Sequence, residues 1–304
     1  MNPLKIRFGG YQSTKSIHNV AALAFGESLS SKLGPEVEFQ LTGNIIDQGH
    51  RVADLISMVD SGELEMCYYS TSHMLNFVPE LSLFDLPFII NQREDGYAIL
   101  DGPLGQKIRE KLSSESNFRI LGYWDNGFRH LTNRVGPIQT PADCKGLRIR
   151  TLISDLHTRV FELLGFDPVQ LDVRELLSSL RSEEIDAQDN ALTNIYNFGV
   201  HKYHPYLTLS RHFFGVVVVL INTTVFNSLS KDQQTAIEEA ATEATAVQRI
   251  AAAKEDELIL KKFDTVDTAI VTLSQKERAQ FIEAVAPIIE EQREYHGDAL
   301  FQYL

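Results

Sequence analysis

The sequence has little positive charge. Its 28 Lys and Arg residues stand against 41 Asp and Glu residues, which gives a formal net charge of −13. Nucleic-acid binding usually requires a basic face that displaces counterions from phosphates, so we expect no nucleic-acid partner. Any anion that binds must be attracted by local groups and not by the field of the whole protein.

Cysteine is scarce, and no long hydrophobic run is present. Cys67 and Cys144 have no metal-ligand spacing, and Cys67 lies in an apolar segment where it should behave as a small hydrophobic residue. The longest apolar stretch, residues 213–221, has the length of a strand and not of the roughly 20-residue helix that crosses a membrane. No apolar signal region opens the chain, which is expected of a cytoplasmic protein or of a mature chain without its leader.

Motifs for cofactor or metal chemistry are also missing. No Walker A loop and no G-x-G-x-x-G follows a strand, so no nucleotide cofactor is expected. His201 and His204 have a spacing that could bind a metal, but no third ligand follows nearby, and we predict no metal site. Ser70 and Ser72 lie outside any G-x-S-x-G elbow, which argues against a serine nucleophile.

Strands and helices alternate along the chain. Residues 4–8, 37–41 and 66–69 have strand patterns, and apolar residues recur at helical spacing between them. This alternation predicts βαβ units and a mostly parallel α/β sheet, whose ligands bind beyond the carboxyl ends of the strands. Ser70 and His73 follow the third strand and are therefore candidates for such a site.

From residue 118 onward, the sequence predicts strands and helices that are longer than those of the first part. Residues 118–132 form either one strand through Asn126-Gly127 or a hairpin that turns at this dipeptide. Residues 231–262 contain neither Pro nor Gly and predict a helix of roughly 48 Å. We expect a last strand over 266–273 and two closing helices over 275–304. Because 304 residues exceed the usual size of one core, the length favours two lobes and leaves one large α/β domain as the alternative. The long helix could span two such lobes.

Arginines on predicted strands indicate an anion site. Arg129 and Arg150 each lie among apolar residues, and the planar, permanently charged guanidinium can bind a carboxylate through two hydrogen bonds. The alternative is structural pairing with an acidic residue, which applies most to Arg148. Tyr69 and Trp124 lie near strand ends, where they either belong to the core or stack on an apolar part of a ligand.

Several segments, in their order and spacing, resemble one family over nearly the whole chain: the extracytoplasmic solute receptors of tripartite ATP-independent periplasmic (TRAP) transporters. The segments that carry the resemblance are Asp85-Leu86-Pro87-Phe88, Asn126-Gly127-Phe128-Arg129, Lys145-Gly146-Leu147-Arg148-Ile149-Arg150 and Gln188-Asp189-Asn190. The resemblance implies two α/β lobes of the periplasmic-binding-protein type, each a mostly parallel sheet flanked by helices, with crossing strands and a long shared helix. The expected lobes are residues 1–126 with about 214–252, and 127–213 with about 253–304.

The resemblance also implies a function. It predicts a periplasmic receptor that closes over a small organic acid by a hinge motion and delivers it to membrane permease subunits, without catalysis or a cofactor and as a monomer. A cytoplasmic α/β enzyme acting on a carboxylate and a ligand-sensing module are the alternatives; a cleaved leader would distinguish the receptor from them.

The residues of the expected site follow by position. In such receptors the arginine that ends the K-G-L-x-x-R segment binds the ligand carboxylate, which implies this role for Arg150. Ser70, His73, Leu152 and Ile153 depart from the sugar-acid type and favour a smaller or more apolar acid. The expected ligand contacts are Arg150, Arg129, Asn190, Tyr69, Ser70, His73, Trp124, Ile153 and Val173.

Overall fold

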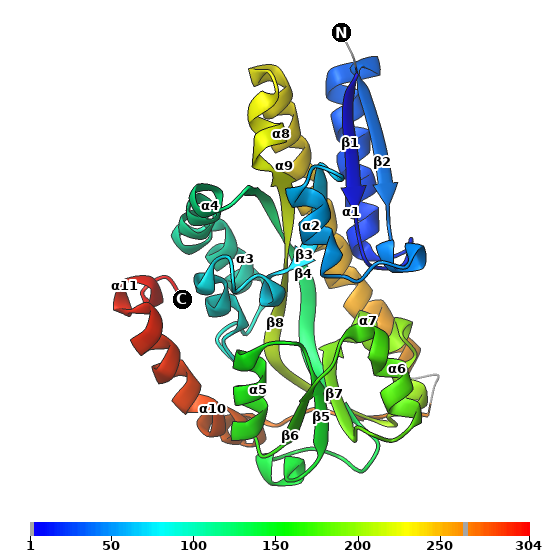
Figure 1. Ribbon diagram of the computed structural model, residues 1–304. Helices are drawn as coiled ribbons and strands as arrows, with labels where there is room; N and C mark the ends of the chain where they lie inside the picture. The colour runs from blue at the N-terminus through cyan, green and yellow to red at the C-terminus, as the bar shows by residue number, and fades with distance from the viewer. Residues whose placement is uncertain (1–2, 264–266) are drawn as a thin grey trace. The chain divides into compact units, whose positions relative to one another are not determined.

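The computed structural model describes residues 3–263 and 267–304 as an α/β protein (Figure 1). The strands are β1 (Leu4–Gly9), β2 (Val37–Thr42), β3 (Met66–Ser70), β4 (Phe118–Asn133), β5 (Arg148–Thr151), β6 (Asp167–Gln170), β7 (Ala187–Ala191), β8 (Tyr206–Asn222) and β9 (Ala269–Val271). The helices are α1 (Ile17–Leu33), α2 (Asp54–Asp60), α3 (Arg93–Asp101), α4 (Pro103–Glu115), α5 (Asp155–Leu163), α6 (Val173–Arg181), α7 (Leu192–Asn197), α8 (Thr223–Ser228), α9 (Lys231–Phe263), α10 (Gln275–His296) and α11 (Asp298–Phe301).

The chain divides into two compact units. Unit 1 consists of Met1–Pro79, Gly105–Asp125 and Val216–Lys254, and unit 2 of Glu80–Leu104, Asn126–Gly215 and Glu255–Leu304. The strands β4 and β8, which are neighbours in the sheet, each contain a boundary between the units, and so does α9. The expected crossing strands and long shared helix are therefore present.

Unit 1 is built on the sheet order β2-β1-β3-β8, in which β1 is parallel to β2 and β3, and β3 is antiparallel to β8. Alternation in β1 buries Ile6 and Phe8 completely and leaves Lys5 exposed, as expected for a strand with one face on the core. The side chain of Ser16 caps α1 by accepting a hydrogen bond from the Asn19 N–H. The polar turn before α1 thus fixes where this helix begins.

Unit 2 has the order β4-β7-β5-β6, with β5 parallel to β6 and β7, and β7 antiparallel to β4. Its strands separate two hydrophobic cores: α5 and α10 contribute to one, and α6, α7 and α9 to the other. Figure 1 shows α5 on one side of these strands and α6 on the other. Capping boxes centred on Asp172 and Ser274 begin α6 and α10.

Strand β4 decides between the two alternatives for Asn126-Gly127. It continues through this dipeptide as one strand of 16 residues, with Gly127 at φ +85°. The single extended strand is therefore correct and the hairpin wrong. The long helix over 231–262 is confirmed as α9, while Val266, the first residue of the expected last strand, lies outside the described residues.

Residues 80–104 were assigned to the first lobe from the sequence, but they pack within unit 2. Ser82 Oγ donates a 3.1 Å hydrogen bond to Gln292 Oε1, and Arg93 forms an ion pair with Asp256. These partners lie more than 150 positions away along the chain, so periodicity could not indicate the contacts. Within the described part of the chain, no helix is both long and apolar enough to cross a membrane.

Candidate functional site

Three of the predicted polar residues lie on neighbouring strands of unit 2. Arg129 is on β4, Asn190 on β7 and Arg150 on β5, and β7 lies between the other two strands. In the register, Asn190 is opposite His130 of β4, and Arg150 is opposite Gln188 of β7. The fold thus brings together residues that are separated by up to 61 positions in the sequence.

Arg150 is a buried cation without a carboxylate partner among the described residues. Its side chain donates two hydrogen bonds to the Leu171 carbonyl oxygen, from Nε at 3.0 Å and from Nη2 at 2.7 Å. Among the residues that the structure describes, Arg150 forms no ion pair, although its exposed fraction is only 2%. Burial, followed by the nearby charge of Arg129, lowers the pKa of Arg150 to about 10. The guanidinium therefore stays charged at neutral pH but lacks a counterion.

Arg129, in contrast, has a partner within the protein. Its Nε forms an ion pair with the Asp189 carboxylate, and its Nη2 donates a 2.7 Å hydrogen bond to the Asp189 carbonyl oxygen. His212 Nε2 lies 3.3 Å from the same carboxylate. Burial alone would raise the pKa of Asp189, but Arg129 and His212 outweigh it and hold this pKa well below its usual range. Asp189 is therefore ionised and neutralises Arg129.

The side-chain amide of Asn190 is oriented by its neighbours. Its Oδ1 accepts hydrogen bonds from the Ala191 N–H at 3.1 Å and from Asn194 Nδ2 at 2.9 Å. Within the described residues, Asn190 Nδ2 donates to no protein acceptor, so its two N–H groups remain available to a ligand oxygen.

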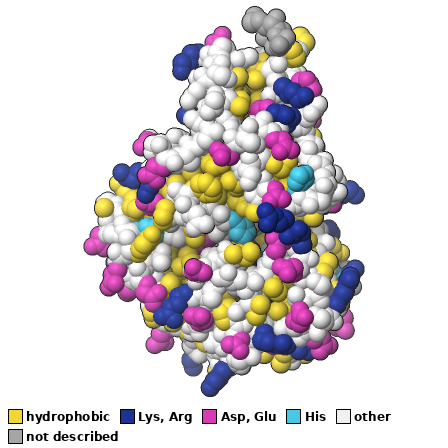
Figure 2. Space-filling model, in the orientation of Figure 1, with side chains coloured by type: hydrophobic (Ala, Val, Ile, Leu, Met, Phe, Trp, Pro, Cys, Tyr) yellow, Lys and Arg dark blue, Asp and Glu magenta, His cyan; other side chains and the backbone are white. Residues whose placement is uncertain are grey.

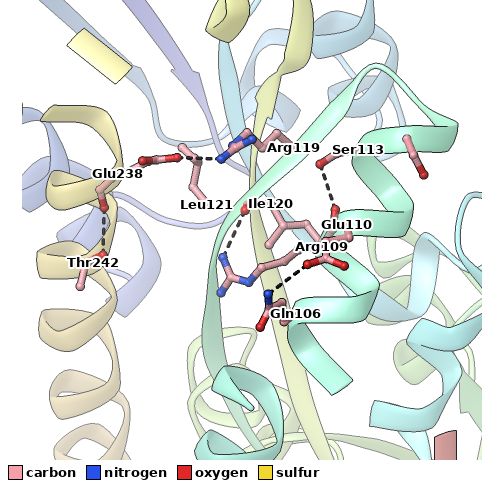
Figure 3. A pocket seen from close by; sticks show the side chains of 10 residues that line it. Gln106, Arg109, Glu110, Ser113, Arg119, Ile120, Leu121, Glu238 and Thr242 are labelled. Carbon is pink, nitrogen blue, oxygen red and sulfur yellow. Dashed lines mark hydrogen bonds and ion pairs between the residues drawn. The ribbon is translucent and has the colours of Figure 1, made fainter. Parts of the chain in front are cut away.

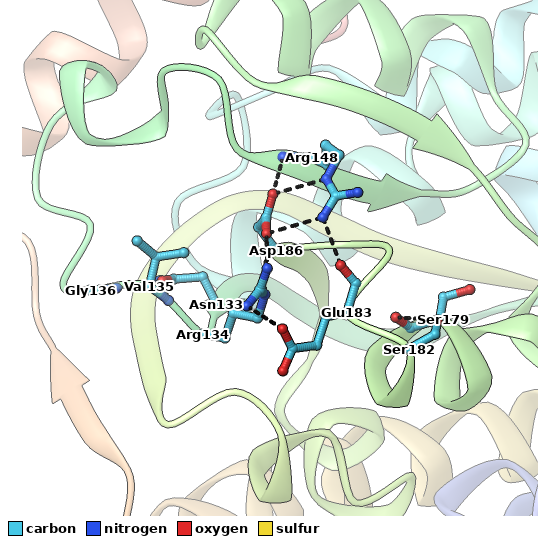
Figure 4. A network of polar contacts seen from close by, with 9 residues as sticks. All are labelled: Asn133, Arg134, Val135, Gly136, Arg148, Ser179, Ser182, Glu183 and Asp186. Atoms are coloured by element: carbon cyan, nitrogen blue, oxygen red, sulfur yellow. Dashed lines mark hydrogen bonds and ion pairs between the residues drawn. The ribbon is translucent and has the colours of Figure 1, made fainter.

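Arg148 belongs to a structural network (Figure 4). Its Nε lies 3.2 Å from Asp186 Oδ2, and its Nη2 donates to the Glu183 carbonyl oxygen at 2.6 Å. Arg134 pairs with the same Asp186 at 2.7 Å and with the Glu183 carboxylate at 3.0 Å. Arg148 is therefore paired with an acidic residue of the protein, which was the alternative to a role in ligand binding.

In unit 1, three predicted contacts lie at the end of β3. Tyr69 and Ser70 end the strand and are largely buried, and His73 closes the 3₁₀ turn Thr71–His73 that follows. The rings of Tyr69 and His73 are 5.9 Å apart. Tyr69, Ser70 and His73 therefore lie at and just beyond the end of β3, as the sequence predicted.

Trp124 lies in the core of unit 1. Its ring stacks on Phe8 and His18, with interplanar angles of 9° and 13°, and its Nε1 donates a 3.2 Å hydrogen bond to Thr245 Oγ1. Its side chain is 1% exposed. Of the two alternatives for Trp124, this environment supports a place in the hydrophobic core and not stacking on a ligand.

Ile153 and Val173 are the apolar members of the prediction in unit 2. Ile153, three residues beyond Arg150, is 57% exposed. Val173 is half-buried at the start of α6, close along the chain to Leu171, the acceptor of the Arg150 hydrogen bonds. Ile153 thus presents apolar surface within three residues of Arg150 along the chain.

Asp189 and His212 contribute to the site in roles that were not predicted from the sequence. Asp189 lies within the segment that carried the resemblance, and its acidic side chain next to Asn190 was a signal that Arg129 had a counterion. His212 precedes the longest apolar run, and its Nδ1 lies 2.7 Å from Ser210 Oγ. Its contact with Asp189 arises from the sheet order, which sequence spacing does not indicate.

Unit 1 also contains a surface cavity of about 630 Å³, bordered by α4, β4 and α9 (Figure 3). Arg119 in its wall pairs with Glu238 at 2.7 Å, and Arg109 donates to the Ile120 carbonyl oxygen at 3.2 Å. None of the predicted contacts lines this cavity. On the face shown in Figure 2, acidic and basic side chains are intermixed. The buried cation in unit 2 therefore differs from the cavity and the surface in lacking an opposite charge.

Residues 8–295 match the family of bacterial extracellular solute-binding proteins, family 7. The chain belongs to this family. It is 28% identical to the 2,3-diketo-L-gulonate-binding periplasmic protein YiaO of Escherichia coli, over 88% of this chain and 80% of that protein. It is similar to the sugar acid binding protein DctPAm of Advenella mimigardefordensis in complex with galactonate, at 30% identity and a TM-score of 0.92, over 99% and 96% of the two chains. A TRAP solute-binding protein of Shewanella oneidensis with bound succinate has 25% identity and a TM-score of 0.92, over 99% and 98%.

Membership of this family establishes the class of function. The protein is a periplasmic solute receptor of a TRAP transporter that binds a small organic acid and works with a membrane permease. The family consists of receptors, so the alternative of an α/β enzyme is wrong. The expected two-lobed α/β fold is confirmed by the similar solved structures.

Proposed function

We propose that this receptor binds the carboxylate of its organic acid on Arg150. The observation that carries the proposal is the buried guanidinium, which has no ion-pair partner among the described residues. Burying a charge without a partner is costly, so a protein that maintains such a charge is suited to receive a counterion. A ligand carboxylate would accept hydrogen bonds from the donors of Arg150 that do not bind Leu171 and would relieve the cost of burial.

Arg129 and Asn190 have secondary roles in this proposal. Arg129 uses Nε and Nη2 to bind Asp189, so its Nη1 group remains to donate a hydrogen bond to the ligand. Asn190 is oriented through its Oδ1 and presents Nδ2 as a donor. Together the two residues would provide directional hydrogen bonds, while Arg150 provides the charge.

For the rest of the ligand, we infer an apolar portion next to the carboxylate. The support is the exposed Ile153 beyond Arg150 and the half-buried Val173 at the start of α6. Tyr69, Ser70 and His73 of unit 1 would complete the contacts, whereas Trp124 is better explained as a core residue. Sugar acids such as the galactonate bound by DctPAm are the second candidate, favoured by that similarity.

We further infer that the two units close over the ligand by a hinge motion and that the receptor acts as a monomer. Support for the hinge comes from β4, β8 and α9, each of which continues through a boundary between the units. Gly127 lies two residues beyond the boundary in β4 at positive φ, where local backbone adjustment is least restricted. Closure would exclude water from the guanidinium and so strengthen its attraction to the ligand.

A thermal-shift screen of organic acids tests the ligand class, because a ligand stabilises the state to which it binds. We expect phenylacetate, benzoate and branched aliphatic acids to raise the melting temperature, and their amides, which lack the charge, to have no effect. If only sugar acids such as galactonate shift the melting temperature, the inferred apolar portion of the ligand is refuted. The proposed binding of a carboxylate is retained. Equal shifts from acids and amides would refute the carboxylate role of Arg150.

A further inference from the structure

The charge balance around Arg150 restricts the ligand further. The charged groups that act on Arg150 are one cation, Arg129, and three anions: Asp189, Asp172 and Glu175. The cation is neutralised by Asp189, with which it forms an ion pair. Asp172 is itself paired with Arg174 at 3.1 Å. Glu175 forms no ion pair among the described residues and accepts a 3.2 Å hydrogen bond from the Asp172 N–H. Arg150 is therefore the one cation of this group without an ion pair, and the group contains no second unpaired cation for a second anion.

The buried histidines near the Arg129–Asp189 pair add no positive charge at neutral pH. Burial is the main cause that lowers the pKa of both His130 and His212. His130 Nδ1 lies 3.3 Å from the Arg211 N–H and accepts a hydrogen bond from it, which requires an unprotonated nitrogen. His212 is in contact with the Asp189 carboxylate, which favours protonation of the imidazole, but burial outweighs this contact and lowers the pKa of His212. Both imidazoles are therefore neutral in the binding unit.

We propose that this receptor selects acids with a single negative charge over dicarboxylates, because Asp189 neutralises Arg129 and leaves Arg150 as the one cation without an ion pair among the described charged groups that act on it. The inference rests on the proposed role of Arg150 and adds a specificity-determining role for Asp189. A second carboxylate would lose its water on closure without gaining a counter-charge from unit 2, which is unfavourable. The similar receptors differ in this respect, since galactonate is a monocarboxylate and succinate a dicarboxylate.

Matched ligand pairs test the inference on the wild-type protein. The pairs are succinamate with succinate and galactonate with galactarate, which have similar sizes and differ by one charge. By calorimetry at neutral pH, we expect the monoanion of at least one pair to bind at least about tenfold more tightly than its dianion. Equal or tighter binding of both dianions would overturn the inference.

Proton uptake gives a second measurement that needs no variant. A dianion that binds in a site with one positive charge should take up a proton, so its apparent binding enthalpy should depend on the ionisation enthalpy of the buffer. Proton uptake measured with the monoanion of the same pair shows how many protons the protein groups themselves take up on binding. A dianion that binds with no more proton uptake than the monoanion would contradict the charge count.

Two variants test the role of Asp189. Asp189→Asn frees the charge of Arg129, and we expect it to shift the affinity ratio toward the dianion by at least about tenfold. The double variant Arg129→Met with Asp189→Asn removes both charges, so the ratio should return toward the monoanion. The two variants share the Asn substitution, and circular dichroism and urea unfolding report whether each is folded. An unchanged ratio in folded Asp189→Asn would overturn the role of Asp189.

Failure of the inference differs from failure of the proposed function. If dicarboxylates bind the wild type as well as monocarboxylates and Arg150→Met abolishes both, the charge selection is wrong and the carboxylate anchor is retained. If Arg150→Met leaves the affinities unchanged, the anchor is wrong and the inference falls with it.

Discussion

Replacing Arg150 by Met is the most direct test of the site. Methionine is unbranched and flexible, so it fills much of the volume of the arginine side chain without the charge. Loss of one partner from a buried charge pair costs about 2–5 kcal/mol, which corresponds to roughly a 30- to 5,000-fold weaker ligand affinity. We therefore expect the variant to show little or no heat of ligand binding at micromolar concentrations.

The same substitution should leave the stability of the unliganded protein nearly unchanged, because two effects offset each other. The lowering of the Arg150 pKa from its ordinary value to about 10 corresponds to roughly 3 kcal/mol that the buried charge costs, and Met removes this cost. Against this, the Leu171 carbonyl oxygen loses its two arginine donors, which costs about 1–3 kcal/mol. We expect the free energy of unfolding to stay within about 2 kcal/mol of the wild type.

Isothermal titration calorimetry measures the affinity, and urea unfolding without ligand measures the stability. Arg148→Met is the matched control, since Arg148 lies two residues earlier on β5 and pairs with Asp186 at 3.2 Å. Its side chain is 44% exposed, and such pairs contribute at most about 1 kcal/mol. The control should therefore bind ligand as the wild type does and remain nearly as stable.

Two results would refute this account of Arg150. Wild-type affinity in Arg150→Met would show that the ligand does not depend on the guanidinium. A destabilisation of more than about 4 kcal/mol would show that Arg150 is mainly a structural residue, because the loss of two hydrogen bonds to Leu171 cannot account for it.

Two further predictions concern stability. The pKa of His204 is lowered from 6.5 to about 4, first by burial and then by Arg134, so the unfolded chain binds a proton in a pH range where the folded protein does not. Stability should fall as the pH falls from about 6.5 toward 4; urea unfolding should show about 2 kcal/mol of this loss between pH 7 and pH 5, and less in His204→Asn. Gly127→Ala places a side chain at φ +85° with its Cβ 3.1 Å from that of Ala191, and we expect a loss of about 1–2 kcal/mol. The control Gly136→Ala, whose new Cβ would contact nothing within 4 Å, should change stability by less than about 0.5 kcal/mol; equal losses would refute the explanation from backbone strain.

Much of the fold was predictable because local patterns determine its elements. Strand patterns located β1, β2 and β3, and the absence of Pro and Gly located α9. The helices α3 and α4, with 9 and 13 residues, were not predicted, and polar residues occupy much of their length. The assignment of residues 80–104 to a unit depends on contacts such as Arg93 with Asp256, which no local pattern encodes.

For the candidate site, the sequence indicated residue types but not their charge state. Arg129, Arg148 and Arg150 have the same side chain and lie in similar apolar surroundings, so periodicity treats them alike. Their partners separate them: Asp189 pairs with Arg129, and Asp186 pairs with Arg148. Both partners come from the segment around β7, which reaches the arginines through the sheet order and not through sequence proximity.

Because Asp189 pairs with Arg129 and not with Arg150, the preferred ligand charge could change between related receptors without a change at Arg150. In the proposed site, Arg150 would bind a carboxylate of a monoanion or of a dianion, since both carry one. The neutralisation of Arg129 would set the preference between them, and a single uncharged residue at position 189 would release a second positive charge without altering Arg150. We therefore expect the affinity ratio of a monoanion to its matched dianion to depend on the charge at position 189, while loss of Arg150 should weaken both members of the pair together.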